Sequence, residues 1–231
     1  MPWPRAILFD FDGVIVNSEP LHFQAFQETL AGEGIPLSEQ EYFRELIGFD
    51  DRGAFHFMFR KHGRPLDEPL FLRLMAAKKA NMRQLIEQRK YQALPGVEDF
   101  VRGLSRNYPL AICSGALGDE IEAMLRGVNL RGCFGVIVSA EDVRVGKPDP
   151  EGYLLTMRLL AEKHKIPLGP SDCLIVEDAP SVARNARAAG FRVLAVANSF
   201  PIEKLAEADW AVPSLRPDVV RAKIPDLEVN A

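Results

Sequence analysis

The feature that most constrains the fold of this chain is a repeated alternation of short apolar runs with helix-like segments. The apolar runs have the length and aliphatic, β-branched composition of buried parallel strands. They lie at 6–10, 109–113, 134–138, 173–177, 192–196 and, more weakly, 209–212. The segments between them carry apolar residues at helical spacing, such as Ile121, Met124 and Leu125. Because strands alternate with helices, we expect an α/β fold with a parallel sheet and helices on both faces.

Residues 17–92 interrupt this alternation with a long insertion. They contain helical runs and no convincing strand, and they lie between the first two predicted strands. Pro95 and Gly96 then indicate where the chain returns to the sheet. We therefore expect a discontinuous core of residues 1–16 and 93–231, and an inserted all-helical cap domain.

Composition limits the class of protein and its partners. The chain of 231 residues is 47% hydrophobic and 26% charged, as in ordinary soluble globular proteins. Its net charge of −4 offers no global attraction for nucleic acid or an anionic membrane, and no apolar run approaches the roughly 18 residues of a membrane span. Cys113, Cys133 and Cys173 lack disulfide-type or zinc-type spacing, and the first residues lack a signal-like apolar region. We expect a cytoplasmic monomer without nucleic-acid or membrane partners.

Polar residues follow several of the predicted strands where those strands end. The carboxyl ends of strands in an open α/β sheet meet at one edge, where such folds place their sites. A lysine that precedes a helix can reach the same edge. The residues expected there are Asp10, Asp12, Ser114, Lys147, Glu177 and Asp178.

The two aspartates after the first strand call for a nearby cation. Asp10 and Asp12 point to the same face of an extended chain, roughly 6–7 Å apart. Like charges at this distance raise each other's pKa, which a neighbouring positive charge offsets. Carboxylate oxygens at this density suit Mg²⁺, which completes its coordination with phosphate and water. The sequence therefore predicts a magnesium site with Lys147 beside it.

Each of these residues also has a structural interpretation. Ser114 could begin a turn or cap a helix, Lys147 could be a surface lysine, and Glu177 with Asp178 could stabilise the next helix N-terminus. The functional interpretation is favoured because all of them fall, in order, at one predicted edge. His22 lies on an apolar stripe, and for it helix packing and a role at the site stay equally open.

Four segments together resemble the motifs of the haloacid dehalogenase superfamily, and within it the β-phosphoglucomutase-like phosphatases. FDFDGVIVNSEPLH is similar to the first motif, ICSG to the second, GKPDP to the third and VEDAPSVARNARAAG to the fourth. The resemblance covers essentially the whole chain. It implies a Rossmann-like core with a helical cap inserted after the first strand.

The resemblance also implies catalytic roles. Asp10 would attack phosphorus and form an aspartyl-phosphate, and Asp12 would protonate the leaving oxygen and then activate water. Ser114 would hydrogen-bond a phosphoryl oxygen, and Lys147 would neutralise developing charge and restrain Asp10.

Metal and substrate ligands follow from the same resemblance. Mg²⁺ would be held by Asp10, the main-chain oxygen of Asp12 and Asp178, with Glu177 nearby or bound through water. The substrate, a small phosphorylated metabolite, would meet a further set of residues. These are Gly13, Gly115, His22, Arg52 and Lys78, with Lys79 as an alternative to Lys78.

Hydrolase and mutase remain to be distinguished within the resemblance. Relatives that cleave carbon–halogen bonds or phosphonates lack an acid at the position of Asp12, so phosphate esters are expected. Mutases carry a Ser-Lys-Asn run after the serine of the second motif, where this chain has Ala116, Leu117 and Gly118. Since these residues offer no side-chain donors for a second phosphate, we expect hydrolysis of a monoester such as a sugar phosphate or phosphoglycolate.

Two alternatives remain open. His22, Arg52 and Lys78 are mutase-like, so a phosphoryl-transfer isomerase is the first alternative. The second is a catalytically silent binding protein on the same scaffold. Such a protein would be expected to have lost Asp10, Asp12 or Lys147, and this chain has all three.

Overall fold

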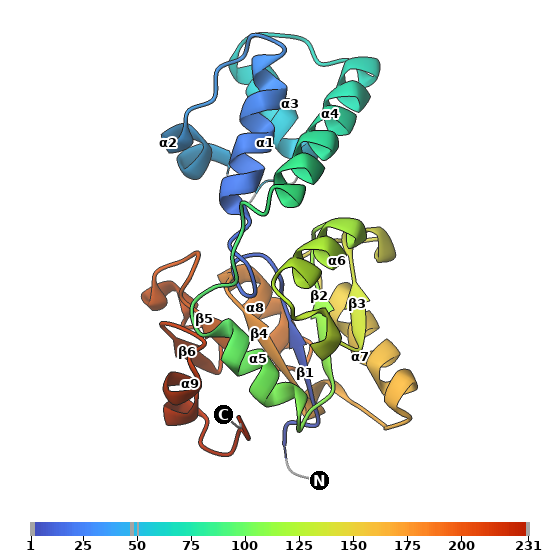
Figure 1. Ribbon diagram of the computed structural model, residues 1–231, viewed down its shortest axis with the longest axis vertical. Helices are drawn as coiled ribbons and strands as arrows, with labels where there is room; N and C mark the ends of the chain where they lie inside the picture. The colour runs from blue at the N-terminus through green and yellow to red at the C-terminus, as the bar shows by residue number, and fades with distance from the viewer. Residues whose placement is uncertain (1–2, 47–48, 50, 230–231) are drawn as a thin grey trace. The chain divides into compact units, whose positions relative to one another are not determined.

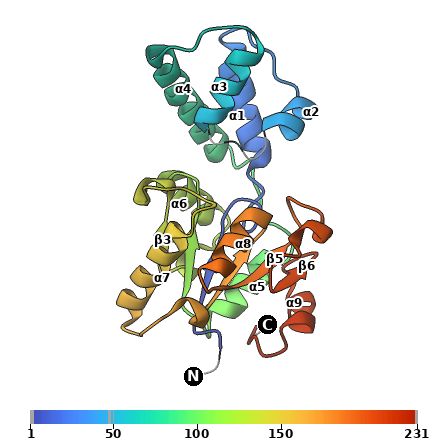
Figure 2. The ribbon, with the colours of Figure 1, turned by 180° about the vertical axis from the view of Figure 1, so that it is seen from behind.

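The computed structural model describes residues 3–46, 49 and 51–229. Figures 1 and 2 show the ribbon from opposite sides. None of the helices in these residues is both long enough and apolar enough to cross a bilayer.

The chain divides into two compact units, which are described separately. The core unit comprises Met1–Asn17 and Gln92–Ala231, and the cap unit comprises Ser18–Tyr91. The boundaries expected from the sequence lie one residue from these. That the units are independent domains stays a prediction.

A six-stranded parallel sheet forms the centre of the core unit. Its strands run in the order β3-β2-β1-β4-β5-β6, and every neighbouring pair is parallel. This is the order of Rossmann-like sheets, in which ligands bind beyond the strand ends where the winding reverses, here beside β1. The predicted fold class is confirmed. The strands are β1 (Ala6–Phe9), β2 (Leu110–Cys113), β3 (Val136–Val138), β4 (Cys173–Glu177), β5 (Arg192–Val196) and β6 (Trp210–Val212).

Helices cover both faces of this sheet because alternate strand residues point to opposite sides. On one face Phe9 meets the ring of Phe100 edge-on, with the centroids 6.1 Å apart. On the other face Leu8 and Cys113 pack in a buried cluster with Tyr153. Figure 1 shows α5 in front of the sheet, and Figure 2 shows α7 and α8 over the reverse face. The core helices are α5 (Val97–Ser105), α6 (Gly118–Gly127), α7 (Glu151–His164), α8 (Pro180–Ala188) and α9 (Pro217–Lys223).

Short 3₁₀ turns join several of these elements, and the cysteines are unpaired. The turns are η2 (Arg131–Cys133), η3 (Ala140–Asp142), η4 (Pro170–Asp172) and η5 (Ile202–Leu205). Cys113 and Cys173 are buried in the sheet, whereas Cys133 is partly exposed. A side chain at Gly152 of α7 would lie 2.8 Å from the Cys113 sulfur, so this glycine allows α7 to approach β2 closely.

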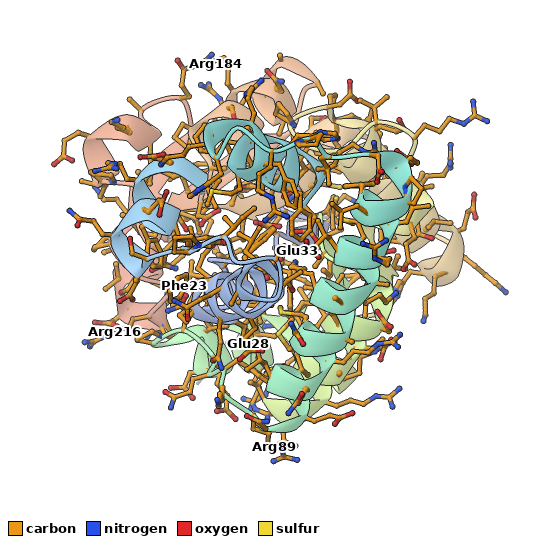
Figure 3. The ribbon with its side chains drawn as sticks, turned by 90° about the horizontal axis from the view of Figure 1, so that it is seen from above. Phe23, Glu28, Glu33, Arg89, Arg184 and Arg216 are labelled. Atoms are coloured by element: carbon orange, nitrogen blue, oxygen red, sulfur yellow. The ribbon has the colours of Figure 1, made fainter. Side chains whose placement is uncertain are left out.

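The described residues of the cap unit form helices around an aromatic core. Phe26 and Phe55 pack ring to ring at 5.1 Å, and Asn81 donates to the Thr29 hydroxyl, which ties α4 to α1. Figure 3 shows Phe23 and Glu28 on α1. The cap elements are α1 (Glu19–Ala31), α2 (Glu39–Glu41), the π-helical turn η1 (Tyr42–Leu46), α3 (Asp51–Lys61) and α4 (Glu68–Glu87).

One cap segment differs from the expected run. The sequence SEQEYFRELIG predicts a single helical segment, but α2 spans only one turn and continues as the π-helical η1. Tyr42 begins the wide turn, donates to Glu19 at 2.8 Å and packs against Phe23. The helix therefore changes from α-helical to π-helical at the residue that makes these contacts with α1. Ile47 and Gly48 of this run lie outside the described residues.

Candidate active site

Lys147 is the central cation of the site. Its Nζ donates to Asp10 Oδ1 at 2.5 Å, to Glu177 Oε1 at 2.8 Å and to the Tyr153 hydroxyl at 3.1 Å. Burial disfavours its charge, but the carboxylates of Asp10 and Glu177 outweigh that cost and raise the pKa of Lys147 well above its usual value. The lysine is therefore charged at neutral pH and fixed by three partners.

Glu177, fully buried at the end of β4, uses both carboxylate oxygens within the protein. Oε1 accepts from Lys147 and from the Tyr153 hydroxyl. Oε2 accepts the backbone N–H groups of Asp178 and Ala179, each at 2.8 Å. Charge-assisted bonds of this kind hold Glu177 in one orientation, so it orients Lys147 and the start of the following loop.

The pKa values of Asp10 and Asp178 are raised despite the nearby charge of Lys147. Burial raises the pKa of Asp10 well above its usual value, against the lowering effect of Lys147. Burial and the neighbouring Glu177 raise the pKa of Asp178 to about 7. One carboxylate oxygen each from Asp10, Glu177 and Asp178 lies within 4.8 Å of the others.

This donor set fits a divalent cation. Buried carboxylates with raised pKa values are stabilised as anions by a positive charge placed among them. Hard oxygen donors without sulfur or imidazole suit Mg²⁺ or a similar ion. Because both oxygens of Glu177 are already engaged, Asp10 and Asp178 are the better candidates for direct ligands.

Asp12 and Ser114 lie together on the rim after β1 and β2. The Ser114 hydroxyl is 3.4 Å from Asp12 Oδ2 and accepts the Ala116 N–H at 3.0 Å. Asp12 is partly exposed, whereas Asp10 is buried. The two carboxylates therefore have different environments, which suits different chemical roles.

Gly13 occupies a position that admits no side chain. Its φ is +74°, and a Cβ there would lie 2.1 Å from Asp178 Oδ2 and 2.6 Å from the Ser199 hydroxyl. Gly115, in contrast, lies next to Ser114, and a Cβ added to it would meet no atom within 4 Å. Glycine is required at residue 13 because the backbone there lies against the carboxylate of Asp178. At residue 115 a side chain would have room.

Three polar residues of the site were not identified from the sequence. Tyr153 binds Lys147 and Glu177 from within α7. After β5, Ser199 donates a short hydrogen bond to Asp178 Oδ2, and Asn198 donates to the Gly13 carbonyl at 2.7 Å. Asn198 and Ser199 follow a predicted strand, and their position after a strand end is the sequence feature that could have identified them as site residues. Tyr153 lies in an apolar helical run, and no sequence feature marks it as a site residue.

The cap unit brings His22 and Lys78 together. Lys78 Nζ lies 3.1 Å from His22 Nδ1 and donates to both oxygens of Asp51 at 2.9 Å. Burial and the charge of Lys78 lower the pKa of His22 to about 3, so the imidazole is neutral. The Arg52 guanidinium instead lies over the Phe71 ring, 4.2 Å from its centroid. The structure thus joins two of the three predicted cap residues in one cluster.

Comparison with known proteins decides the family. A model of the haloacid dehalogenase-like hydrolases matches residues 7–196. The chain belongs to this family. Protein CbbY of Rhodobacter capsulatus is 30% identical, covering 96% of this chain and 98% of its own. A phosphorylated carbohydrates phosphatase of Thermotoga maritima is 28% identical, covering 94% and 96%.

Solved structures of the same family share the fold. A CbbY mutant from Rhodobacter sphaeroides, in complex with xylulose-(1,5)bisphosphate, has a TM-score of 0.77 at 26% identity, covering 94% of this chain and 96% of that one. The predicted membership of the β-phosphoglucomutase-like phosphatase branch is confirmed, and the comparisons place the CbbY proteins in the same branch. The predicted enzyme class, a phosphatase of this family, is confirmed as well.

Proposed function

We propose that this haloacid dehalogenase-like phosphatase hydrolyses a phosphate monoester of a small sugar-like metabolite through a covalent intermediate on Asp10. The observation that carries the proposal is Lys147, which links Asp10 to Glu177 beside Asp178. The named phosphatase relative from Thermotoga maritima supports phosphorylated carbohydrates as the substrate class.

Asp10 is the nucleophile in this proposal. A carboxylate oxygen of Asp10 forms the new bond to phosphorus while the bond from phosphorus to the ester oxygen breaks. Lys147 holds Asp10 Oδ1 at 2.5 Å, which fixes the carboxylate and places positive charge beside the reaction. Tyr153 and Glu177 keep the lysine in that place.

Asp12 moves the protons. Its side chain donates a proton to the departing alcohol oxygen, then accepts one from the water that attacks the aspartyl-phosphate, which returns Asp10 to its carboxylate form and releases phosphate. Ser114, 3.4 Å from Asp12 Oδ2, would donate its hydroxyl to a phosphoryl oxygen in this proposal. The partial exposure of Asp12 gives it access to water.

A divalent cation, Mg²⁺ in our proposal, would be held by Asp10, Asp178 and the main-chain oxygen of Asp12. When bound, it would supply positive charge that neutralises the transferring phosphoryl group. The hydrogen bond from Ser199 would orient Asp178 for that task. The prediction of a cytoplasmic monomer stands beside this proposal, and light scattering on the purified protein checks the monomer.

Turnover of p-nitrophenyl phosphate with and without Mg²⁺ tests the proposal. We expect metal-dependent release of phosphate by the wild type, and a loss of at least about 10³-fold in Asp10→Asn, because the attacking charge is removed. Asp226→Asn, at an exposed position after α9, is the matched control and should retain activity. Absence of metal-dependent turnover across a panel of sugar phosphates, phosphoglycolate and nucleoside monophosphates would favour the silent binding protein.

Phosphorus NMR separates hydrolase from mutase. β-Glucose 1-phosphate incubated with enzyme and Mg²⁺ should yield inorganic phosphate without a bisphosphate activator. Ala116, Leu117 and Gly118 offer no side-chain donors to hold a second phosphate. Glucose 6-phosphate that accumulates faster than free phosphate would overturn the hydrolase and support the isomerase.

A further inference from the structure

Asn198, in the turn after β5, reaches the loop that carries Asp12. Its side-chain amide donates to the Gly13 carbonyl at 2.7 Å, and the two residues lie 185 positions apart in the chain. In the sheet, β4 lies between β1 and β5. Asn198 therefore joins the loops of two strands that are not neighbours, and it holds the loop after β1 from outside.

Two peptide groups meet at Gly13, and both must be held to fix the orientation of Asp12. The first joins Asp12 to Gly13, whose N–H donates to the Val16 carbonyl at 2.9 Å. Because a trans peptide is planar, this bond also sets the direction of the Asp12 carbonyl. Gly13 has a φ of +74°, and glycine permits rotations that other residues resist, so the second peptide needs its own support.

The second peptide, between Gly13 and Val14, depends on Asn198. The Val14 N–H lies 3.3 Å from the Phe11 carbonyl, which also accepts the Ile15 N–H at 2.8 Å. The first of these distances is longer than usual for a hydrogen bond, whereas the bond from Asn198 to the Gly13 carbonyl is short. Asn198 is therefore the stronger support of this peptide, and it holds the loop in which the proposed proton donor lies.

The backbone around Asn198 gives this side chain a fixed base. The Ala197 N–H donates to the Val212 carbonyl of β6 at 2.9 Å, and the Asn198 N–H donates to the Val196 carbonyl of β5 at 3.0 Å. Val196 and Val212 are fully buried, so the turn starts from the packed interior. Asn198 itself lies at the surface, and its replacement therefore removes the hydrogen bond to Gly13 without opening the core.

We propose that Asn198 is a positioning residue that acts through the Gly13 carbonyl and keeps Asp12 in the orientation in which it protonates the leaving oxygen. The inference rests on the proposed phosphatase function and assigns a supporting residue to its proton transfer. A misplaced general acid costs most when the departing oxygen is strongly basic, because a weakly basic oxygen leaves without a proton. The role of Asn198 therefore predicts a dependence on the leaving group, which a purely structural role does not.

The test compares p-nitrophenyl phosphate with phenyl phosphate in the wild type and in Asn198→Ala, with Mg²⁺ present. The two esters are similar in size, but p-nitrophenolate is a much weaker base than phenolate. We expect kcat/KM for phenyl phosphate to fall about tenfold more than that for p-nitrophenyl phosphate, because kcat/KM includes the step in which the ester oxygen departs. Asp12→Asn, which removes the acid itself, should show the same preference at least as strongly.

Two other asparagines that donate to a main-chain carbonyl are matched controls. Asn107, before β2, donates to the Glu228 carbonyl at 3.1 Å, and Asn107→Ala should retain wild-type values for both esters. Asn185 donates to the Pro148 carbonyl at 3.0 Å, next to Lys147. Asn185→Ala loosens the loop of the lysine and should lower kcat/KM for both esters equally, because the charge of Lys147 acts on the phosphoryl group of either ester.

Hydrogen exchange of the metal-free protein keeps the inference separate from the proposed function. Peptides that cover residues 12–16 should exchange faster in Asn198→Ala than in the wild type, whereas peptides that cover α5 should not change. Unchanged exchange at residues 12–16, or an equal loss of kcat/KM for both esters in Asn198→Ala, would overturn the role of Asn198. A wild type that hydrolyses neither ester, with faster exchange at residues 12–16 in Asn198→Ala, would instead overturn the proposed function and leave Asn198 as the support of this loop.

Discussion

Glu177 and Asp178 are adjacent in sequence but face different partners. Glu177 makes its four contacts with Lys147, Tyr153 and two backbone N–H groups. Asp178 accepts a hydrogen bond from the Ser199 hydroxyl, and one of its carboxylate oxygens lies close to one of Asp10. The family resemblance assigned direct metal binding to Asp178 and a nearby or water-mediated place to Glu177. The residues alone could not show which oxygens the fold already occupies, and the structure shows both oxygens of Glu177 engaged.

Substitution of each acid by its amide should separate these roles. Asp178→Asn removes the charge of a proposed metal ligand, so the Mg²⁺ concentration for half-maximal activity should rise at least about tenfold. Glu177→Gln places an NH₂ group against donors, and should lower kcat and cost about 2–4 kcal/mol of stability with a smaller change in Mg²⁺ requirement. Mg²⁺ titrations of activity and urea unfolding measure the two effects. Equal shifts in Mg²⁺ requirement would contradict the division.

Gly13 is the position in the site where the smallest substitution should have the largest effect. In Gly13→Ala the new methyl group would overlap Asp178 and Ser199 at a positive φ, so the loop has to move away from the carboxylates. We expect a loss of activity of more than about 100-fold and destabilisation of about 1–3 kcal/mol. Gly132→Ala, where no atom lies within 4 Å of the added carbon, is the control. Wild-type activity in Gly13→Ala would show that the close approach is not required.

At the scale of elements, the strands were predicted closely and the irregular segments were not. β4 and β5 have the bounds expected from their apolar runs, because a buried strand needs an uninterrupted apolar stretch. The wide turn η1 depends on contacts of Tyr42 with residues far along the chain, which local spacing does not encode. Glu141, in an exposed acidic turn, accepts the Gly118 N–H at the start of α6 at 3.1 Å, a contact that sequence alone does not show.

The cluster that joins α1, α3 and α4 predicts a pH dependence of stability. His22 has its pKa lowered from 6.5 to about 3 by burial and by Lys78, and Lys78 is held by Asp51 of α3. The unfolded chain binds the proton near pH 6.5 whereas the folded chain does not. Stability from this group is therefore complete above pH 6.5 and is lost as the pH falls towards 3, by on the order of 3 kcal/mol at pH 4.5.

Urea unfolding at pH 7.5 and 4.5 measures this dependence. His22→Gln keeps an acceptor for Lys78 without the titration, so its stability should fall less between the two pH values than that of the wild type. His62→Gln replaces an exposed histidine at the end of α3 and should retain the wild-type difference. If the stability of His22→Gln fell as much between pH 7.5 and 4.5 as that of the wild type, His22 would not be the cause of the pH dependence.

For the whole molecule, the sequence motifs indicated where the candidate site lies, and the fold adds polar residues from outside those motifs. Asp10, Ser114 and Glu177 lie where β1, β2 and β4 end, because parallel strands end at a common edge. Tyr153, Asn198 and Ser199 join them from elements whose sequence has no recognisable motif. Their contacts form only when the helix and the β5 loop pack against the sheet, so the supporting polar contacts were harder to predict than the residues proposed to react.

Because α7 packs closely on β2 at Gly152, next to Cys113, the reaction rate of this buried thiol measures how often the helix separates from the sheet. Burial raises the pKa of Cys113 to about 11 and that of Cys173 to about 12, and thiol reagents attack the thiolate. In a labelling time course, Cys133 should react first, and the other two should react at rates set by transient separation of helices from the sheet. Mass spectrometry of each peptide would read these rates. Fast labelling of Cys113 in the native protein would show that α7 detaches readily, and that Lys147, which contacts Tyr153 on the same helix, loses its anchor just as often.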